Sequence, residues 1–184
     1  LAHPAQELFR RCSEELPWKL PDAGPQELAL IAGACAKLRA YEATLFRHLA
    51  ALSLQELERL EPRHAANLLH AFARVDASTP RLFQALAERL CAPGFPDRLS
   101  TAAVSQACFA ASSAAVHLPA LLRGTVRPLL EVLARRLMAL GGARGAKLEA
   151  RHVAAMARAC LQAGTGSRRL VRFLAVHLLA AAGA

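Results

Sequence analysis

Aromatic residues make up only 5% of this chain, with one Trp and one Tyr, so large rings cannot form most of its core. Hydrophobic residues nevertheless reach 54%, mainly as Leu, Ala and Val. Over 184 residues this composition can bury a sizeable core, which excludes a disordered chain. Ala and Leu have the highest helix propensities, and no long alternation of apolar and polar residues indicates a strand. The composition therefore predicts an all-α protein.

Motifs for catalysis, metal binding and membrane insertion are also missing. The apolar stretch "LLEVLARRLMAL" is interrupted by Arg135 and Arg136, and it is shorter than the roughly 20 residues that cross a bilayer. The five cysteines contain no CxxC pair, so we interpret them as small buried hydrophobes. The seven histidines form no HExxH motif, and GxSxG, P-loop and GxGxxG motifs are absent. We therefore expect no enzyme activity, cofactor, metal, membrane association or small-molecule substrate.

Acidic residues are nearly absent from the second half of the chain. Residues 1–98 contain 12 Lys/Arg and 12 Asp/Glu, whereas residues 99–184 contain 11 Lys/Arg and only two acids, Glu131 and Glu149. The net charge of +9 therefore comes entirely from the C-terminal half. Only three of the 23 basic residues are Lys, and the guanidinium group of Arg binds phosphate through paired hydrogen bonds. A GC-rich genome would produce the same preference, so the position of the charge is more informative than its type.

The sequence repeats itself with a period near 37 residues. The pair Leu-Phe begins at Leu8, Leu45 and Leu82, at intervals of 37 residues. A second set of segments aligns independently, at 25–38, 62–75, 99–114 and 148–163; "LEPRHAANLLHAFARV" and "LEARHVAAMARACLQA" show the likeness best. An insertion of eight residues around "VHLPALLRG" lengthens the third unit. Two markers with one period indicate a helical-repeat protein.

Each unit is predicted to be a hairpin of two helices. Pro25 and Pro62 stand where the first helical turn tolerates proline, and Ser100 is a suitable helix cap. One hairpin cannot bury its apolar faces alone, so the hairpins must stack. We predict a single domain over residues 1–184, an α-solenoid of about four hairpins. Its units are a half repeat at 1–20 and hairpins at 23–57, 60–93, 99–141 and 148–182.

The repeat resembles the heptatricopeptide and octotricopeptide repeats of organellar proteins and the helical repeats of FAST-kinase-like proteins. "LEPRHAANLLHAFARV" followed by "RLFQALAERL" carries the resemblance, which covers almost the whole chain and is clearest over 60–93. It implies an RNA-binding protein of the mitochondrion or another organelle such as the plastid, and some members of such families belong to mitochondrial ribosomes. Many members carry a C-terminal RAP domain that these residues do not contain. This departure favours a structural component over an RNA-processing factor.

In such solenoids the first helix of each unit can present side chains to RNA. In the unit at 60–93 the polar positions of that helix recur at spacings that place them on one stripe, and some have polar counterparts in later units. Amide groups can read base edges, and Arg can grip phosphate or stack on a base. The candidate positions are Arg63, Asn67, His70, Arg74, Gln106, Arg151 and Arg158. An ordinary solvated helix face is the alternative interpretation of this stripe.

A denser basic cluster lies in the last two units. Nine basic residues with one acid among them favour contact with the phosphate backbone of folded RNA, because aromatic residues for base stacking are scarce there. The alternative is a soluble basic face whose Arg stems cover apolar surface. The cluster consists of Arg123, Arg127, Arg135, Arg136, Arg144, Lys147, Arg168, Arg169 and Arg172.

These observations predict an organellar RNA-binding helical-repeat protein, most plausibly a structural component of a mitochondrial ribosome. Its expected partners are ribosomal RNA and neighbouring proteins of a ribonucleoprotein assembly. One alternative is a protein–protein scaffold of the armadillo or HEAT type, whose basic face meets an acidic partner. Another is a fragment of a larger organellar RNA-processing factor.

Overall fold

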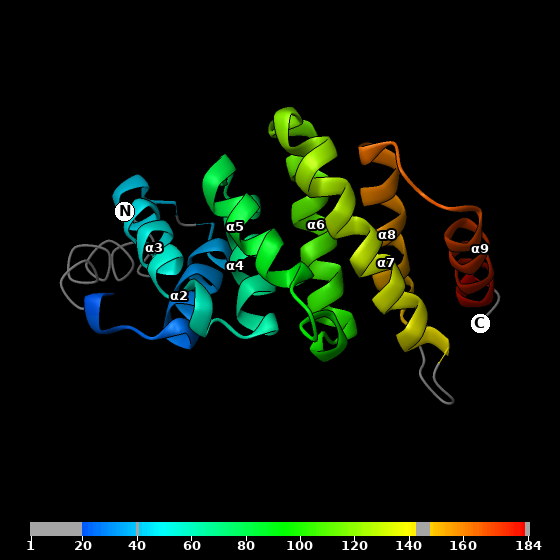
Figure 1. Cartoon of the computed structure of the whole chain (residues 1–184), viewed down its shortest axis with the longest axis horizontal. Coiled ribbons are helices and arrows are strands. Elements are labelled where there is room, and N and C mark those ends of the chain that lie inside the picture. Colours follow the sequence, from blue (N-terminus) through cyan, green and yellow to red (C-terminus); the bar gives the residue numbers. More distant parts are fainter. Residues whose placement is uncertain (1–19, 40, 143–147, 183–184) are drawn as a thin grey trace, which may run out of the picture.

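The computed structural model describes residues 20–142 and 148–182, except residue 40 (Figure 1). Every regular element among these residues is helical, which confirms the all-α prediction. None of the described helices is long and apolar enough to cross a membrane. The predicted half repeat at 1–20 lies almost wholly outside the described residues.

Eight α-helices account for most of the described chain, and five short helical turns lie before or between them. The α-helices are α2 (Pro25–Lys37), α3 (Ala43–Gln55), α4 (Pro62–Arg74), α5 (Pro80–Cys91), α6 (Thr101–His117), α7 (Arg127–Gly142), α8 (Ala150–Ala163) and α9 (Arg168–Ala182). The turns are η1 (Leu20–Asp22), η2 (Leu57–Arg59), η3 (Pro96–Arg98), η4 (Pro119–Leu121) and η5 (Leu122–Val126).

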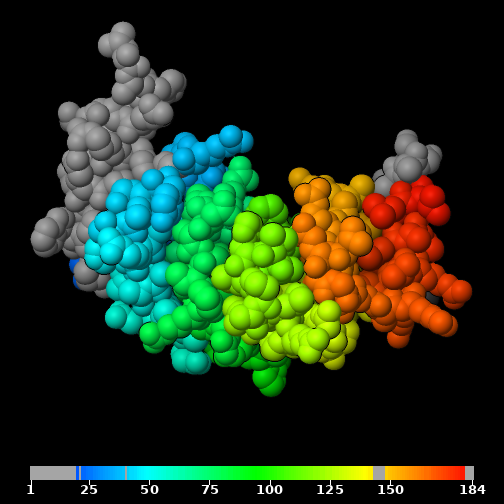
Figure 2. Space-filling view, turned by 90° about the horizontal axis from the view of Figure 1, so that it is seen from above, coloured from blue at the N-terminus to red at the C-terminus, as the bar shows by residue number. Residues whose placement is uncertain are grey.

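The helices form two rows. In the first row α2, α4, α6 and α8 pack each on the next, and these are the most extensive contacts between elements. In the second row α3, α5, α7 and α9 follow in the same order, and each packs against its partner in the first row. The pairs succeed one another in sequence order along an elongated molecule (Figures 1 and 2). Segments distant in the sequence therefore meet only where neighbouring pairs touch.

Proline and short polar side chains define where the helices begin. Pro25, Pro62 and Pro80 occupy the first turn of α2, α4 and α5, where their missing N–H group costs nothing. The Thr79 hydroxyl accepts a hydrogen bond from the Leu82 N–H, as an N-cap does. The Ser100 hydroxyl accepts from the Ala103 N–H in the same way, so the predicted cap of this helix is present.

A left-handed residue ends the first helix of three pairs. Arg39 follows α2 with φ 53°, Asp76 follows α4 with φ 54°, and Gly164 caps α8 with φ 58°. These positions are equivalent in the predicted repeat. The equivalent position in the third unit is Ala115, which stays helical, so α6 runs for 17 residues where α4 has 13. The insertion predicted there continues as η4 and the π-helical turn η5.

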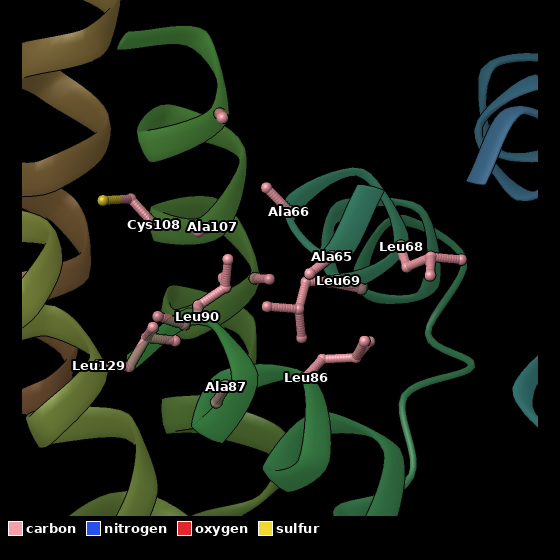
Figure 3. Close-up of a cluster of buried hydrophobic side chains, with 14 of the residues drawn as sticks. Ala65, Ala66, Leu68, Leu69, Leu86, Ala87, Leu90, Ala107, Cys108 and Leu129 are labelled. Carbon is pink, nitrogen blue, oxygen red and sulfur yellow. The ribbon is translucent and has the colours of Figure 1, made fainter. Parts of the chain in front are cut away.

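The core between the rows is built from leucine and small residues. Figure 3 shows Ala66 and Leu69 of α4 directed at α6, while Leu86 and Leu90 of α5 fill the space beside them. These side chains are at most 1% exposed. Alanine at the contact lets the helix axes approach closely, so leucine alone can fill what remains. This explains how a core can form with few aromatic residues.

Three of the cysteines are buried in this core, as expected for small hydrophobes. Cys35, Cys108 and Cys160 are at most 8% exposed. The sulfur atoms of Cys108 and Cys160 lie 3.9 and 3.7 Å from that of Met156. Burial raises the pKa of both thiols, which keeps them protonated and weakly reactive. Cys12 lies outside the described residues.

Gly164 provides a test of the left-handed helix stop. A Cβ added there would meet its nearest neighbour, an Arg127 nitrogen, at 3.6 Å, so the cost of Gly164→Ala is conformational and not steric. We expect the free energy of unfolding, measured by urea denaturation, to fall by about 1 kcal/mol. Gly142→Ala is the control, because Gly142 lies at the helical end of α7 with open space around its Cβ position. An equal loss in both variants would contradict this explanation.

His64 provides a test of buried charge in α4. Its side chain is 8% exposed, Arg63 donates to its Nε2 at 3.1 Å, and its buried Nδ1 has no partner. Burial lowers its pKa below the usual 6.5, with the Arg63 charge as the second cause. As the pH falls, His64 therefore takes up a proton in the unfolded chain before it does so in the folded chain. Its contribution to the free energy of unfolding is present above pH 6.5 and is lost as the pH drops toward the lowered pKa. We expect His64→Gln to flatten this fall in denaturation curves between about pH 7.5 and 5. An unchanged pH profile would assign the fall to other groups.

Candidate nucleic-acid interface

One edge of the molecule gathers basic side chains. There the first-row helices end and the second-row helices begin, and the turns after α6 and α8 lie at this edge, at the top of Figure 1. Five of the six basic residues are exposed and Arg127 is half-buried. We call this set the basic edge: Lys37, Arg39, Arg74, Arg123, Arg127 and Arg168.

Acidic residues on the basic edge belong to the first two pairs only. Glu42 caps α3, where its carboxylate accepts from the Thr44 N–H, and Asp76 follows α4. No Asp or Glu occurs between residues 98 and 130. Arg123 therefore has no acidic neighbour in sequence, whereas Arg127 has Glu131 one turn further along α7, and the positive charge grows toward the C-terminal pairs.

Two arginines of the basic edge also tie neighbouring pairs together. The Nε of Arg74 donates to the Ala36 carbonyl in the last turn of α2, at 3.2 Å. The Nε of Arg127 donates to the Ala163 carbonyl, which ends α8, also at 3.2 Å. A cation at a helix C-terminus offsets the negative end of the helix dipole. For the Ala36 carbonyl, which also accepts from the Arg39 N–H, the bond from Arg74 is an additional one. The terminal guanidinium nitrogens carry further donors that can bind phosphate.

The exposed side of the first row carries the predicted amide and histidine positions. Asn67 and Gln106 are half-buried on α4 and α6, and Arg158 is exposed on α8. His70 packs edge-on against Phe109 of α6, with ring centroids 5.1 Å apart. Burial lowers the pKa of His70, with smaller contributions from Arg74 and Lys37, so the ring is neutral at pH 7.

Phe109 is a candidate that the sequence reasoning missed. It is 41% exposed, and the repeat aligns it with His70, so the two rings occupy the same position on adjacent helices. An exposed ring packed on His70, which feels the charges of Arg74 and Lys37, can stack on a base while nearby cations hold the phosphate. The alignment of His70 with an aromatic residue was the signal available in the sequence.

Two predicted arginines lie at the opposite edge, among acids. Arg63 and Arg151 have equivalent positions in the first turns of α4 and α8, and each pairs with the glutamate two residues earlier. The pairs, Arg63 with Glu61 at 3.2 Å and Arg151 with Glu149 at 2.8 Å, are exposed. Further ion pairs join Arg59 to Glu56, Arg89 to Glu58 and Arg98 to Glu61. This mixed charge makes the opposite edge less attractive to phosphate than the basic edge.

The second-row arginines differ in direction even when they are adjacent in sequence. Arg135 is exposed on α7, whereas Arg136 is half-buried and donates from Nε to the Leu99 carbonyl at 2.9 Å. Arg89 holds the equivalent position in α5, donates to the Glu58 carbonyl at 2.5 Å, and covers the Phe95 ring at 4.1 Å. Arg136 thus has a structural role, because it ties α7 to the residue before α6. Arg169 and Arg172 are exposed on α9, and Arg144 and Lys147 lie outside the described residues.

The predicted cluster at 123–172 is therefore not one patch. Arg123, Arg127 and Arg168 share the basic edge, Arg135 and Arg172 lie on second-row helices, and Arg136 points inward. Within the described part of the chain no group of three or more His, Cys, Asp or Glu side chains could hold a metal ion. No protein-family model and no curated protein matches the chain.

The different directions of Arg135 and Arg136 can be measured. Arg136→Ala removes a partly buried, charge-assisted hydrogen bond, so we expect it to lower the free energy of unfolding by about 2 kcal/mol. Arg135→Ala removes an exposed side chain, and we expect a change within about 0.5 kcal/mol. Urea denaturation of both variants checks the difference. If both variants lost the same free energy of unfolding, the hydrogen bond from Arg136 to the Leu99 carbonyl would add no stability beyond that of an exposed arginine.

Proposed function

We propose that this chain is an RNA-binding α-solenoid with a period near 37 residues, and that it grips the RNA backbone with the basic edge. The supporting observation is the segregation of charge between the two edges, with cations lining one of them and the ion pairs lying at the other. Phosphate contacts need cations that are free of acidic neighbours, and Arg123 and Arg168 meet that condition best.

Backbone contact fits the surface better than base-by-base reading of a long strand. Tyr41 and Phe109 are the aromatic side chains with large exposed area among the described residues. Proteins that thread single strands usually stack successive bases on several rings. The single His70–Phe109 pair beside the basic edge offers one stacking position, so most of the binding energy would come from charge. Folded RNA exposes phosphate groups that such cations can contact.

The resemblance to organellar helical repeats supplies the biological setting of the proposal. It supports a structural protein of a mitochondrial ribosome, in contact with ribosomal RNA and neighbouring proteins. Insertion into such an assembly demands backbone contacts and protein contacts, and it does not demand sequence-specific recognition. The paired rows and their equivalent helix stops at Arg39, Asp76 and Gly164 support the repeat on which this resemblance rests.

Fluorescence anisotropy with a labelled structured RNA over a salt series tests the proposal. Arg123→Gln with Arg168→Gln removes two exposed cations of the basic edge, and neither residue makes a core contact. If each contacts one phosphate, the slope of log affinity against log salt should fall by roughly 0.7 to 0.9 per residue.

Arg59→Gln with Arg98→Gln is the matched control at the opposite edge. Both side chains are exposed and paired with glutamates, so their loss should leave the salt slope nearly unchanged. An equal decrease in both variants would show that binding is not confined to the basic edge. No binding by the unmodified chain at low salt would refute the RNA proposal.

A further inference from the structure

Three sulfur-bearing side chains meet where α6 packs on α8. The Sγ atom of Cys108 in α6 lies 3.9 Å from the Sδ atom of Met156 in α8, and the Sγ atom of Cys160 lies 3.7 Å from the same Sδ atom. Cys108 and Met156 are fully buried, and Cys160 is 8% exposed. Figure 3 shows the sulfur of Cys108 on the side of α6 that faces away from α4. Two thiols and one thioether thus form a cluster between two helices of the first row.

The repeat shows that packing does not require sulfur at these three positions. Hydrocarbon side chains fill them at both earlier contacts of the first row, between α2 and α4 and between α4 and α6. All of these side chains are at most 1% exposed. They are Ala32, Leu68 and Phe72 at the first contact and Leu69, Ala107 and Ala111 at the second. A single buried cysteine is an ordinary small hydrophobe, whereas three sulfur atoms in contact form a set of metal ligands.

The chemistry of these ligands identifies the metal. Thiolate and thioether sulfur atoms are soft ligands that select Cu(I). Structural Zn²⁺ takes four ligands, and in the described part of the chain no third His, Cys, Asp or Glu side chain joins the two cysteines. The cysteines come from different helices, so the search for a CxxC pair in the sequence could not find them.

The spacing of the sulfur atoms suits a trigonal site. Three sulfur atoms bound about 2.3 Å from a central ion, at 120° to one another, lie roughly 4 Å apart. Met156 stands 3.9 and 3.7 Å from the two thiols, so its thioether already has the separation that such a site needs. The two thiols also interact with each other, since the charge of Cys160 adds to burial in raising the pKa of Cys108.

We propose that Cys108, Met156 and Cys160 form a three-coordinate Cu(I) site between α6 and α8. Binding forms two bonds from copper to thiolate and one bond to the thioether. Both thiol protons are released to the solvent, and the copper does not change its oxidation state. This inference goes beyond RNA binding, because it assigns a metal site to the core of the array.

The surroundings of the cluster favour the bound state. Cu(I) with two thiolates carries a net charge of −1, and residues 99–184 contain 11 Lys/Arg but only two acids. This excess of positive charge stabilises an anionic centre. Cys160 also lines a cavity of about 490 Å³ between α7, the turn after α8 and the start of α9. An ion can therefore reach one ligand of the site without separation of α6 from α8.

Anaerobic titration of the reduced full chain with Cu(I), in competition with the chelator bathocuproine disulfonate, tests the inference. We expect the chain to take one Cu(I) ion from the chelator, and X-ray absorption should find three sulfur neighbours at about 2.3 Å. Cys108→Ala with Cys160→Ala should abolish this binding. The matched control is Cys35→Ala with Cys91→Ala, which removes two thiols elsewhere in the molecule and should leave the site unchanged.

Met156→Leu tests the thioether with little change in the volume of the core. Loss of a group that only supports a metal ligand already weakens binding about tenfold or more. Loss of a ligand should therefore weaken Cu(I) binding by at least roughly tenfold, and X-ray absorption should then find two sulfur neighbours. This variant keeps the test decisive even if the chain with both cysteines replaced does not fold.

Three results would overturn the inference. They are failure of the unmodified chain to take Cu(I) from the chelator, an equal loss of binding in the control variant, and an unchanged affinity of Met156→Leu. RNA binding by Met156→Leu should match that of the unmodified chain, which separates this test from that of the proposed function.

Discussion

The close approach of α2, α4, α6 and α8 is the contact on which the rest of the structure depends. Alanine at the contact points, with Ala65, Ala66 and Ala107 fully buried, lets these helices pack at short distance. That spacing brings the end of each helix within reach of its neighbour, so Arg74 and Arg127 can bond to carbonyls of adjacent pairs. A larger residue at Ala66 would separate the helices and remove both the core contact and the cross-pair bonds nearby.

Helix chemistry accounts for only part of the charge on the basic edge. Free carbonyls at the end of a helix attract Arg and Lys, whereas free N–H groups at its start favour acids. Lys37 and Arg74 end α2 and α4, and Glu42 caps α3, as these preferences require. Arg127 and Arg168 instead stand at the first positions of α7 and α9, where the helix dipole favours acids. The cations of the last two pairs are therefore not explained by the stability of their own helices.

Much of the fold could be predicted from the sequence, because periodic apolar positions and proline starts are local signals. The helix pairs at 60–93 and 148–182 are of this kind. The directions in which side chains point were harder to predict from the sequence. Arg135 and Arg136 are adjacent and chemically identical, yet only Arg136 reaches the Leu99 carbonyl, since the rotation of α7 against the preceding loop decides which one points inward. For the same reason, the seven described residues of the predicted basic cluster are distributed over several surfaces. Phe109 could be recognised as a candidate only from the packing of α4 against α6, which brings it against His70 and which no single segment of the sequence reveals.

The extended third unit has a consequence for assembly of the fold. Hairpins with nearly equivalent faces can dock out of order, and repeat proteins misfold in this way. Here α6 lacks the left-handed stop, runs four residues past the length of α4, and continues through η4 and η5. Thr125 and Val126 of this extension are buried against the third pair. The extension also contacts α5 of the preceding pair. If α8 skipped α6 and docked on α4, the contacts between η5 and α5 would not form, so the irregular unit disfavours that order.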